Sequence, residues 1–492
     1  MTSTTGGFEM AGESVLLLAR VKLEAVTPLS ISTGQPDNVF DTALVRDANG
    51  LPAIPGTALA GVLRHLWLGR HGEASADALF GHQTGSEGAP SRVAVSWGHL
   101  CDSQGRVADG LLLGDAAKRL TSDPLFATAL AQVDAPVFRN RVRLTHRGAA
   151  ADTGKFDRAV LPAGNRFIVE LRLWSGAGHD DTEFDRLLSL LAHPGLRVGG
   201  ATRAGLGRLK TVDIAIARLD MEQAADRARL KNLSRDLNDW RGLAAYTPTP
   251  RPAEQADWLR GTLRLEPRGA WRIGQGDAPP SGAEKPADLL PVVESRIDWA
   301  AGAGGYTPAM LLVPASSIKG ALAHRMAFHA RRLSDTWRAA AETAHDLDEK
   351  PGAVVDLFGE AKNGASADDD EGFGKAGCLY IDDAFVSVSE VKLAQLMHNA
   401  IDRFTGGVRD RVLYDEEVVL GGVIEIELAL DTQRLRSADT RAALHLAIRD
   451  LCEGRLALGS RSTTGNGFFC GRLSGPLQAW LDPSAQLQGE AA

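Results

Sequence analysis

The stretch "GLPAIPGTALAGVLRHL", residues 50–66, changes character at its centre. The Pro55-Gly56 pair is typical of a tight turn. From Leu59 onward, apolar side chains recur three and four residues apart, which places them on one face of a helix. The stretch "MLLVPASSIKGALAHR", residues 310–325, repeats this turn and helix. Because one chain carries the same unit twice, we expect a duplicated domain, and other landmarks should repeat as well.

Further landmarks do repeat, and in the same order. Pro55 corresponds to Pro314, and the glycines of "RVGGATRAGLGRLK" (197–210) return in "LALGSRSTTGNGFFCGRL" (456–473). Between these lies "LFG", at 79–81 and again at 357–359. We therefore predict two homologous domains at 1–218 and 258–484. A linker at 219–257, first helical and then Pro-rich, would join them, and 485–492 would form a tail.

The bulk composition bounds the class of protein. A chain of 492 residues is too long for one ordinary core, and within each half strands alternate with two helices. This favours an α+β unit with helices on one face of an antiparallel sheet. The formal net charge of −8 excludes nucleic-acid binding by a global basic field, so any such binding needs local patches. The four cysteines lack CxxC spacing and the N-terminal apolar run is short, so we expect a cytoplasmic protein with no membrane partner.

The ordered motifs resemble a known family. The second half carries "VPASSIKGALAHR" (313–325) and "HNAIDRFTGGVRDRVLYDEEVV" (398–419), and each half ends in a Gly-rich loop. Each half resembles the RAMP (repeat-associated mysterious protein) family, the RNA-binding backbone subunits of type III CRISPR effector complexes. The resemblance implies two tandem ferredoxin-like, RRM-related RAMP domains with inserted loops and thumb hairpins. It also implies a role in antiviral defence, in which the chain binds guide crRNA and cleaves complementary target RNA.

The same resemblance implies the partners: crRNA, target RNA, other RAMP subunits, a large cyclase-like subunit and a small helical subunit. RNA contacts are expected in three places. Helix starts expose backbone N–H groups that attract phosphate, and we expect Thr57 or Ser316-Ser317 to cap them. Gly-rich loops let backbone N–H groups approach phosphate, and hairpin arginines add charge. The candidate RNA-binding residues are Gly56, Thr57, Ser316, Ser317 and Lys319 at the helix starts; Gly199, Gly200, Arg203, Gly205, Gly459, Ser460, Arg461 and Gly465 in the loops; and Arg139, Arg141, Arg143, Arg147, Arg403 and Arg409 in the hairpins.

At each of these three places, a purely structural interpretation competes with RNA binding. Small residues also suit a packed helix start, Gly-rich segments also form ordinary turns, and a hairpin can simply be solvated. The first hairpin, "FRNRVRLTHR" (138–147), has four arginines and no acid. The second hairpin mixes arginines with five acidic residues, so its RNA role rests on the resemblance and not on charge.

Two loop aspartates are the catalytic candidates that the resemblance implies. Asp41 lies in "FDTALVRD" (40–47), and Asp288 lies in "KPADLLPVVESRIDW" (285–299), where one extra residue separates it from Pro291. A lone carboxylate can hold Mg²⁺ or another divalent ion, or it can accept the proton of an attacking 2′-hydroxyl. Asp37 and Asp47 remain alternatives, because loop aspartates are commonly turn residues.

Two other functions stay open. The chain can be a crRNA-binding scaffold without catalytic activity. It can also be a crRNA-processing endoribonuclease that uses His65 and His324, which occupy the same position in the two repeats.

Overall fold

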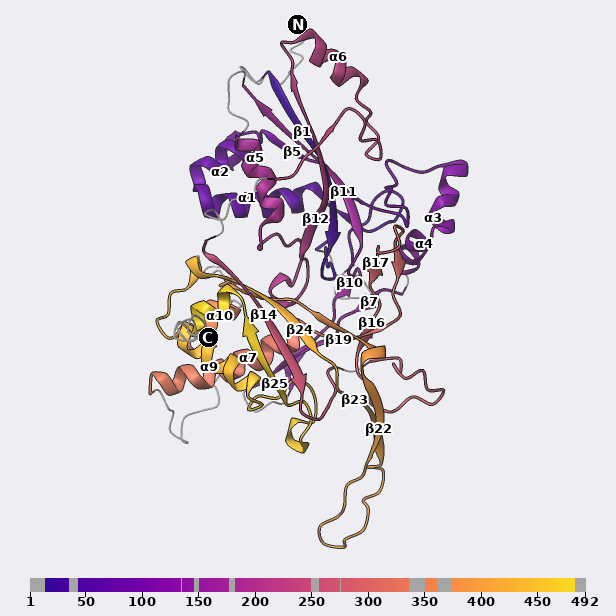
Figure 1. Cartoon of the computed structure of the whole chain (residues 1–492), viewed down its shortest axis with the longest axis vertical. Helices are drawn as coiled ribbons and strands as arrows, with labels where there is room; N and C mark the ends of the chain where they lie inside the picture. The colour runs from indigo at the N-terminus through magenta and orange to yellow at the C-terminus, as the bar shows by residue number, and fades with distance from the viewer. Residues whose placement is uncertain are drawn as a thin grey trace, which may run out of the picture.

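Two α+β units follow one another along the long axis of the molecule (Figure 1). The computed structural model describes residues 14–34, 43–133, 135–145, 150–176, 182–248, 256–274, 276–335, 350–360 and 374–482. Each unit has its own apolar core: one gathers residues from Val15 to Ile214, and the other gathers residues from Leu263 to Leu481. None of the helices in the described ranges is long and apolar enough to cross a membrane.

The first unit is built on an antiparallel sheet with the strand order β12-β1-β11-β5. Along the chain the elements run strand, helix, strand, strand, helix, strand. When these four strands are numbered along the chain, they lie in the sheet in the order 4-1-3-2, which is that of a ferredoxin-like fold. The main strands are β1 (Val15–Ala25), β5 (Val93–Val95), β11 (Arg166–Ser175) and β12 (Leu209–Asp220), and the short strands β2 (Ala53–Ile54), β6 (Gly98–Leu100) and β13 (Ala244–Ala245) extend the sheet.

The second unit repeats this order as β25-β14-β24-β20. Its strands are β14 (Trp258–Pro267), β20 (Leu379–Ile381), β24 (Ile424–Asp431) and β25 (Phe469–Ser474). The identical order in the two halves confirms the predicted tandem of ferredoxin-like domains.

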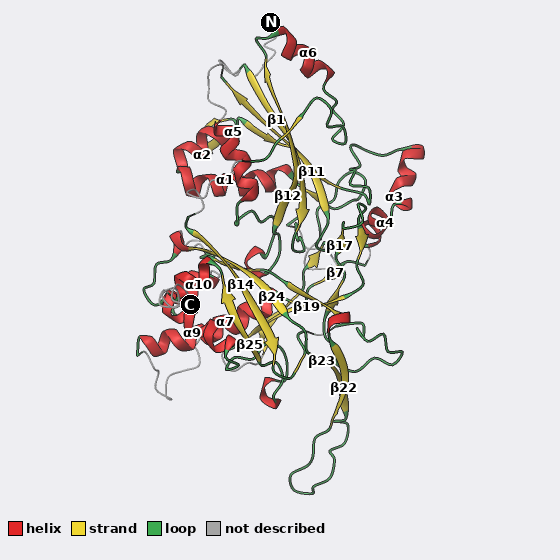
Figure 2. Ribbon diagram, in the orientation of Figure 1, coloured by secondary structure: helices red, strands yellow, loops and turns green. Residues whose placement is uncertain are grey.

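Helices cover one face of each sheet (Figure 2). In the first domain these are α1 (Gly56–His71), α2 (Glu73–Phe80) and α5 (Thr182–Ser189); in the second they are α7 (Ala315–Leu333), α8 (Gly352–Phe358), α9 (Thr440–Cys452) and α10 (Pro476–Leu481). Each large buried residue of α1 has a buried counterpart in α7: Leu59 corresponds to Ile318, Leu63 to Leu322, and Trp67 to Met326. The helical periodicity in the sequence therefore marks the core-facing stripe.

The segment predicted as a linker covers the other face of the first sheet. It contains α6 (Ala224–Asn232) and continues with Leu237 and Trp240 packed near β1 and β11. Arg20 of β1 is only 1% exposed; it pairs with Glu170 at 2.9 Å and donates to the carbonyl of Asp236 at 2.9 Å. Much of the predicted linker is thus part of the first domain.

Smaller elements project from the two sheets. The first domain inserts α3 (Lys118–Ser122) and α4 (Pro124–Ala131) and carries the strand pairs β3 (His82–Thr84) with β4 (Glu87–Ala89), β7 (Val137–Phe138) with β10 (Ala159–Val160), and β8 (Arg141–Leu144) with β9 (Ala150–Phe156). The second carries β16 (Val293–Glu294), β19 (Met310–Val313) and β21 (Ala384–Ser387) in one small sheet; β17 (Ile297–Asp298) with β18 (Gly305–Tyr306); and β15 (Ala270–Trp271) with β23 (Tyr414–Leu420) and β22 (Lys392–His398).

The turn that opens α1 is fixed by close packing. Pro55 is the N-cap residue, and a β-carbon on Gly56 would lie 2.2 Å from the carbonyl oxygen of Val95. Helix α7 starts in the same way after Pro314. The prediction that serine or threonine caps these helices is wrong, because proline is the N-cap residue of both helices and Thr57, Ser316 and Ser317 lie inside the first turn.

Gly56→Ala tests this packing, with Gly61→Ala in the same helix as the matched control. Gly56→Ala should destabilise the protein by about 1–3 kcal/mol, because its methyl group collides with β5. A β-carbon at Gly61 meets no atom within 4 Å, so Gly61→Ala should be neutral or stabilising by up to about 1 kcal/mol. The urea midpoint of unfolding measures both, and equal midpoints for the two variants would contradict the packing account.

Candidate functional site

A buried cluster of charges joins the two domains, and we call it the Arg–Asp joint. Asp382 and Asp383 lie in the turn between β20 and β21, with side chains 5% and 1% exposed. Arg197 and Arg208 of the first domain contact the carboxylate of Asp382 at 2.6 Å and 2.5 Å. Arg139 contacts Asp383 at 3.2 Å and, from the other side, Glu294 of the second domain at 2.7 Å. Four arginine–carboxylate pairs therefore hold the domains in one arrangement.

Asp383 also supplies the helix cap that the sequence did not reveal. Its Oδ1 accepts a hydrogen bond from the backbone N–H of Ala315, the first residue of α7, at 2.7 Å. Burial raises the pKa of Asp383 to about 6, against the opposing charge of Arg139. A β-carbon on Gly205 would lie 2.4 Å from the same Oδ1, so the glycine is what lets the first domain approach so closely.

The first Gly-rich loop (199–207) therefore lies in the contact between the domains. The N–H of Gly200 donates to the carbonyl of Ser30 at 2.7 Å, and a β-carbon on Gly199 would collide with that oxygen. Arg203 donates to the carbonyl of Gly377 and to the hydroxyl of Tyr380. The backbone of this loop is thus occupied by protein contacts.

The second Gly-rich loop (459–467) has the same backbone but an open tip. Arg461 adopts φ +60°, as its counterpart Ala201 adopts φ +55°, and a β-carbon on Gly465 would meet no atom within 4 Å. The N–H of Ser460 donates to the carbonyl of Arg272 at 3.0 Å, and Gly459 would collide with that oxygen if it carried a β-carbon.

Arg461 turns inward and not toward solvent. Its Nε lies 3.3 Å from Glu416, a fully buried carboxylate, and its guanidinium also contacts Tyr414 and His398. The open part of the second loop is therefore its backbone from 462 to 465, and the side chain of Arg461 is used to hold the base of the second hairpin.

Three cations gather where the first hairpin meets α7. Arg141 of β8 donates to the carbonyl of Ala204 at 3.3 Å, and burial lowers its pKa to about 10. Burial also lowers the pKa of Lys319 in α7 to about 8, and the positive charges of Arg203, Lys350 and Arg141 act in the same direction. We call Arg141, Arg203 and Lys319 the cationic group. Arg143, two residues along β8, is exposed, and Arg147 lies outside the described residues.

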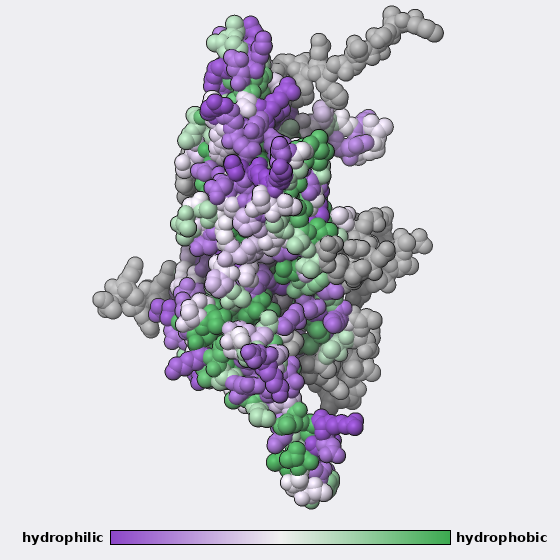
Figure 3. All heavy atoms as spheres, turned by 90° about the vertical axis from the view of Figure 1, so that its right-hand side faces the viewer, coloured by the Kyte–Doolittle hydropathy of each residue, from purple (hydrophilic) through white to green (hydrophobic). Residues whose placement is uncertain are grey.

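The second hairpin, β22–β23 with its loop 399–413, forms a finger at the lower end of the molecule (Figure 1). Its surface is apolar as much as charged: Phe404 is 82% exposed, and the guanidinium of Arg403 lies 4.7 Å from its ring centroid. Arg409 is exposed. Figure 3 shows apolar residues at this end in direct contact with solvent. The other exposed apolar side chains of the finger are Leu396, Met397, Ile401, Val408, Leu413 and Leu420.

Of the two candidate aspartates, the structure describes one. Asp41 lies outside the described residues, as does Asp37. The N–H of exposed Asp288 donates to Oδ1 of Asp415 at 2.8 Å, and its own Oδ2 accepts the N–H of Asp415 at 3.1 Å. This N–H from Asp288 is the main reason that the pKa of Asp415 is lowered. Asp288 thus lies at the base of the second hairpin, against the start of β23.

Other titratable candidates have local roles or lie apart from this place. The carboxylate of Asp47 accepts the N–H groups of Asn49 and Leu51, which makes it a turn residue. His65 and His324 lie on exposed turns of α1 and α7. Partial burial and the charge of Arg434 lower the pKa of His65. Among the described residues, no group of three or more His, Cys, Asp or Glu is placed to hold a metal ion.

Comparison with known proteins decides the family. The sequence profile of the RAMP superfamily matches residues 22–210 and 299–470. The chain belongs to the RAMP superfamily. A chain in the cryo-EM structure of the type III-B Cmr-beta complex bound to cognate target RNA is similar at 14% identity and a TM-score of 0.28, over 41% of this RAMP protein and 60% of that chain. A search of curated proteins finds no match.

Within this RAMP protein, four residues predicted to contact RNA are engaged by the protein itself. Arg139 is buried and paired with two carboxylates, Arg203 is bonded to the second domain, and Gly205 is covered by Asp383. Gly56 is likewise buried against β5. Sequence reasoning also missed the apolar finger. The sequence feature that could have revealed the finger is a set of apolar residues in a segment rich in glycine and charged residues, where no core strand is expected.

Arg139→Met tests the joint, with exposed Arg143→Met as the control from the same hairpin. Arg139→Met should cost about 3–5 kcal/mol, because it leaves Glu294 and Asp383 buried without their cation. Arg143→Met should change stability by less than about 0.5 kcal/mol. Thermal unfolding measures both, and an Arg139→Met protein as stable as the control would show that the joint does not hold the domains.

Proposed function

We propose that this RAMP protein is a backbone subunit of a type III CRISPR ribonucleoprotein that binds guide crRNA and cleaves complementary target RNA in antiviral defence. Membership of the RAMP superfamily and the tandem ferredoxin-like domains support this role. The observation that carries RNA binding is the cationic group beside the first turns of α7. There, positive charges from both domains crowd together, and an RNA phosphate between them would be bound favourably.

The lowered pKa values of Lys319 and Arg141 give the physical reason. Burial and like charges make each cation less stable than in water. A phosphate placed between them would supply the missing negative charge and would raise both pKa values again. Ser316, in the first turn of α7, would add a hydroxyl donor. The Arg–Asp joint assembles this group, since Arg141 and Lys319 come from different domains.

The finger would contact RNA through stacking as well as charge. Exposed Phe404, with Arg403 over its ring, offers a flat apolar surface to a base. Base–aromatic stacking contributes about 1–3 kcal/mol per base and needs no particular sequence. In Figure 1, the base of the first hairpin (β7, β10) and the finger (β22, β23) lie along the same side of the molecule, so one RNA strand could pass both.

For cleavage, we propose that Asp288 in the second domain and Asp41 in the first act on the target strand. The carboxylate of Asp288 is exposed at the base of the finger, where guide-paired RNA would lie. It would accept the proton of a target 2′-hydroxyl as that oxygen attacks the adjacent phosphorus. The 5′-oxygen of the next nucleotide leaves, and a 2′,3′-cyclic phosphate remains.

A divalent ion such as Mg²⁺ would fit this place as a shared ligand of protein and RNA. Asp288 and Asp415 present two neighbouring carboxylates, and Mg²⁺ is commonly held by one or two carboxylates together with substrate phosphates. Bound there, the ion would polarise a phosphate oxygen. Asp288 would hold the ion, and the backbone of β23 would fix the orientation of its carboxylate.

The second candidate function is a crRNA-binding scaffold without cleavage. The reciprocal hydrogen bonds between Asp288 and Asp415 favour it, because each carboxylate accepts the backbone N–H of the other residue and so has a local structural role at the start of β23. A crRNA-processing role for His65 and His324 has weaker support, since the structure places them on separate helices of separate domains.

The pH dependence of guide binding tests the cationic group. Lys319 has a pKa lowered to about 8, so it is charged at pH 7 and mostly neutral at pH 9. RNA affinity should therefore fall as pH rises from 7 to 9, with protons taken up on binding. Lys319→Arg should bind RNA with an affinity that hardly changes over this range, because arginine stays charged. Fluorescence anisotropy with a labelled guide at constant salt measures this, and equal pH profiles for the two proteins would exclude Lys319 from the RNA site.

Product patterns test the aspartates. Asp288→Asn keeps an oxygen for the N–H of Asp415 but cannot act as a base, so it should remove one target product by at least about 100-fold while the guide stays bound. Asp41→Asn should remove a different product. Asp410→Asn, in the loop of the finger, is the control and should leave every product in place. If all products persist in both variants with the guide bound, the protein is a scaffold.

A further inference from the structure

An arm of the second domain reaches back onto the first. The arm is the β17–β18 hairpin, residues 297–306, and its central residue is Trp299. The indole N–H of Trp299 donates to the carbonyl of Gly164 at 2.8 Å, and the guanidinium of Arg166 lies 4.1 Å from a Trp299 ring centroid. The backbone of the arm is held on both sides, by Ile297 N–H to Ala163 O at 2.8 Å and by Gly304 N–H to Ser103 O at 2.7 Å.

We call the place that receives Trp299 the socket. The indole also packs with Cys101, Val107 and Ile168 of the first sheet. A β-carbon on Gly105 would come within 3.9 Å of the ring, and one on Gly164 would collide with the arm's backbone. The socket is thus formed by Arg166 and Ile168 of β11, the turn before β11 and the turn after β6, and Glu24 at the end of β1 pairs with Arg166 at 2.9 Å.

The strand registers identify the counterpart of this socket in the second domain. In the first domain, Glu24 pairs with Lys210, which follows the first Gly-rich loop. In the second domain, Glu266 pairs with Cys470, which holds the equivalent position after the second Gly-rich loop. Glu266 is therefore the counterpart of Glu24. Gly164 before β11 has φ +88°, and Gly422 before β24 has φ +87°.

The turn after β6, which borders the socket in the first domain, has a counterpart in the second domain as well. Gly98 of β6 pairs with Ile54, and Ala384 of β21 pairs with Val313. Gln104 lies six residues after Gly98, and Glu390 lies six residues after Ala384, so Glu390 is the counterpart of Gln104. In the first domain this position belongs to the turn at Gly105 that borders Trp299.

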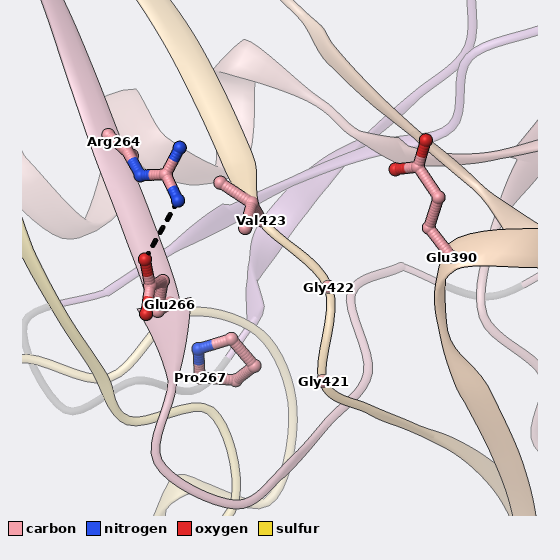
Figure 4. Close-up of a pocket in the computed structure, with 7 residues that line it drawn as sticks. All are labelled: Arg264, Glu266, Pro267, Glu390, Gly421, Gly422 and Val423. Carbon is pink, nitrogen blue, oxygen red and sulfur yellow. Dashed lines mark hydrogen bonds and ion pairs between the residues drawn. The ribbon is translucent and has the colours of Figure 1, made fainter.

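In the second domain these counterparts surround an open cavity of about 470 Å³ (Figure 4). The guanidinium of Arg264 lies 3.0 Å from Glu266 at its edge and is 41% exposed, so it is available to stack on an aromatic ring as Arg166 does. The lining residues are Arg264, Glu266, Pro267, Glu390, Gly421, Gly422 and Val423.

We propose that this cavity is a docking socket for the corresponding arm of the next backbone subunit, and that the arm inserts an aromatic side chain over Arg264. The arm would be the segment between that subunit's first strand and first helix. The proposal rests on the proposed function only in assuming that a neighbouring subunit exists.

A second copy of this chain does not fit as the occupant. The arm arises within the 38 residues between Ile273 and Leu312, whereas the equivalent part of the first domain, between Ile31 and Ala53, has only 21. The neighbour is therefore a different chain, whose segment before its first helix is long enough to form such an arm.

Photo-crosslinking in the assembled complex identifies the occupant. The chain carrying p-benzoylphenylalanine at Glu390 is purified with the other subunits and the guide, irradiated, and analysed by peptide mass spectrometry. The expected product joins position 390 of this chain to a different RAMP-type chain, within the segment that precedes that chain's first helix. Arg449, exposed on α9 behind the sheet, is the control position and should give no such product. A crosslink to RNA, to another copy of this chain or to a different kind of segment would overturn the proposal, as would none at all.

Filling the socket gives an independent measure. Val423→Trp should reduce association with the neighbouring subunit at least tenfold in native mass spectrometry while guide binding is unchanged; Arg449→Trp should change neither. Glu390→Trp, on the rim, replaces Val423→Trp if thermal unfolding shows that the latter does not fold. If both socket variants assemble normally, the socket is not a docking site. If the unmodified chain binds no guide at all, it is the proposed function that fails and not the socket.

Discussion

The buried carboxylates Asp382 and Asp383 are the constraint on which the rest of the molecule depends. Taking two adjacent carboxylates out of water is costly, and three arginines of the first domain and the N–H of Ala315 compensate for it. Because the compensating groups come from another domain, they are in place only in one relative arrangement. Any displaced arrangement of the two domains would leave a buried charge unpaired, so these pairs favour this arrangement over others. The cationic group, built from Arg141, Arg203 and Lys319, exists only in that arrangement.

The two domains share a backbone but not a surface. Glycines with positive φ return at equivalent positions, Gly199 with Gly459 and Gly205 with Gly465, because the backbone there leaves no room for other residues or needs a left-handed conformation. The side chains around them have diverged. The first loop carries the arginines of the joint, whereas the second turns Arg461 inward to Glu416 and leaves its tip open. A duplication has therefore produced one closed contact inside the chain and one different, open surface at its end.

This division explains what the sequence could predict. The tandem fold followed from proline, glycine and apolar positions, all of which report on the local backbone and core, and the strand order confirmed it. The protein partners of Arg139 and Arg203 could not be predicted, because a basic residue is the same in sequence whether its partner is a phosphate or a protein group far along the chain. The cap of α7 was missed for the same reason, since Asp383 lies 68 residues from Ala315. The roles of Asp41 and Asp288 in cleavage stay predictions.

Hydrogen–deuterium exchange of the full chain, with and without a bound guide RNA, tests the central claim most directly. The account predicts that RNA protects the backbone of β8–β9, the finger loop 399–413 and the start of α7. It also predicts that the first Gly-rich loop exchanges slowly already in the free protein, because the joint covers it. Protection of the two hairpins together would mean that one RNA strand crosses both domains. Unchanged exchange in both hairpins with the guide bound, or fast exchange of residues 199–207 in the free protein, would contradict it.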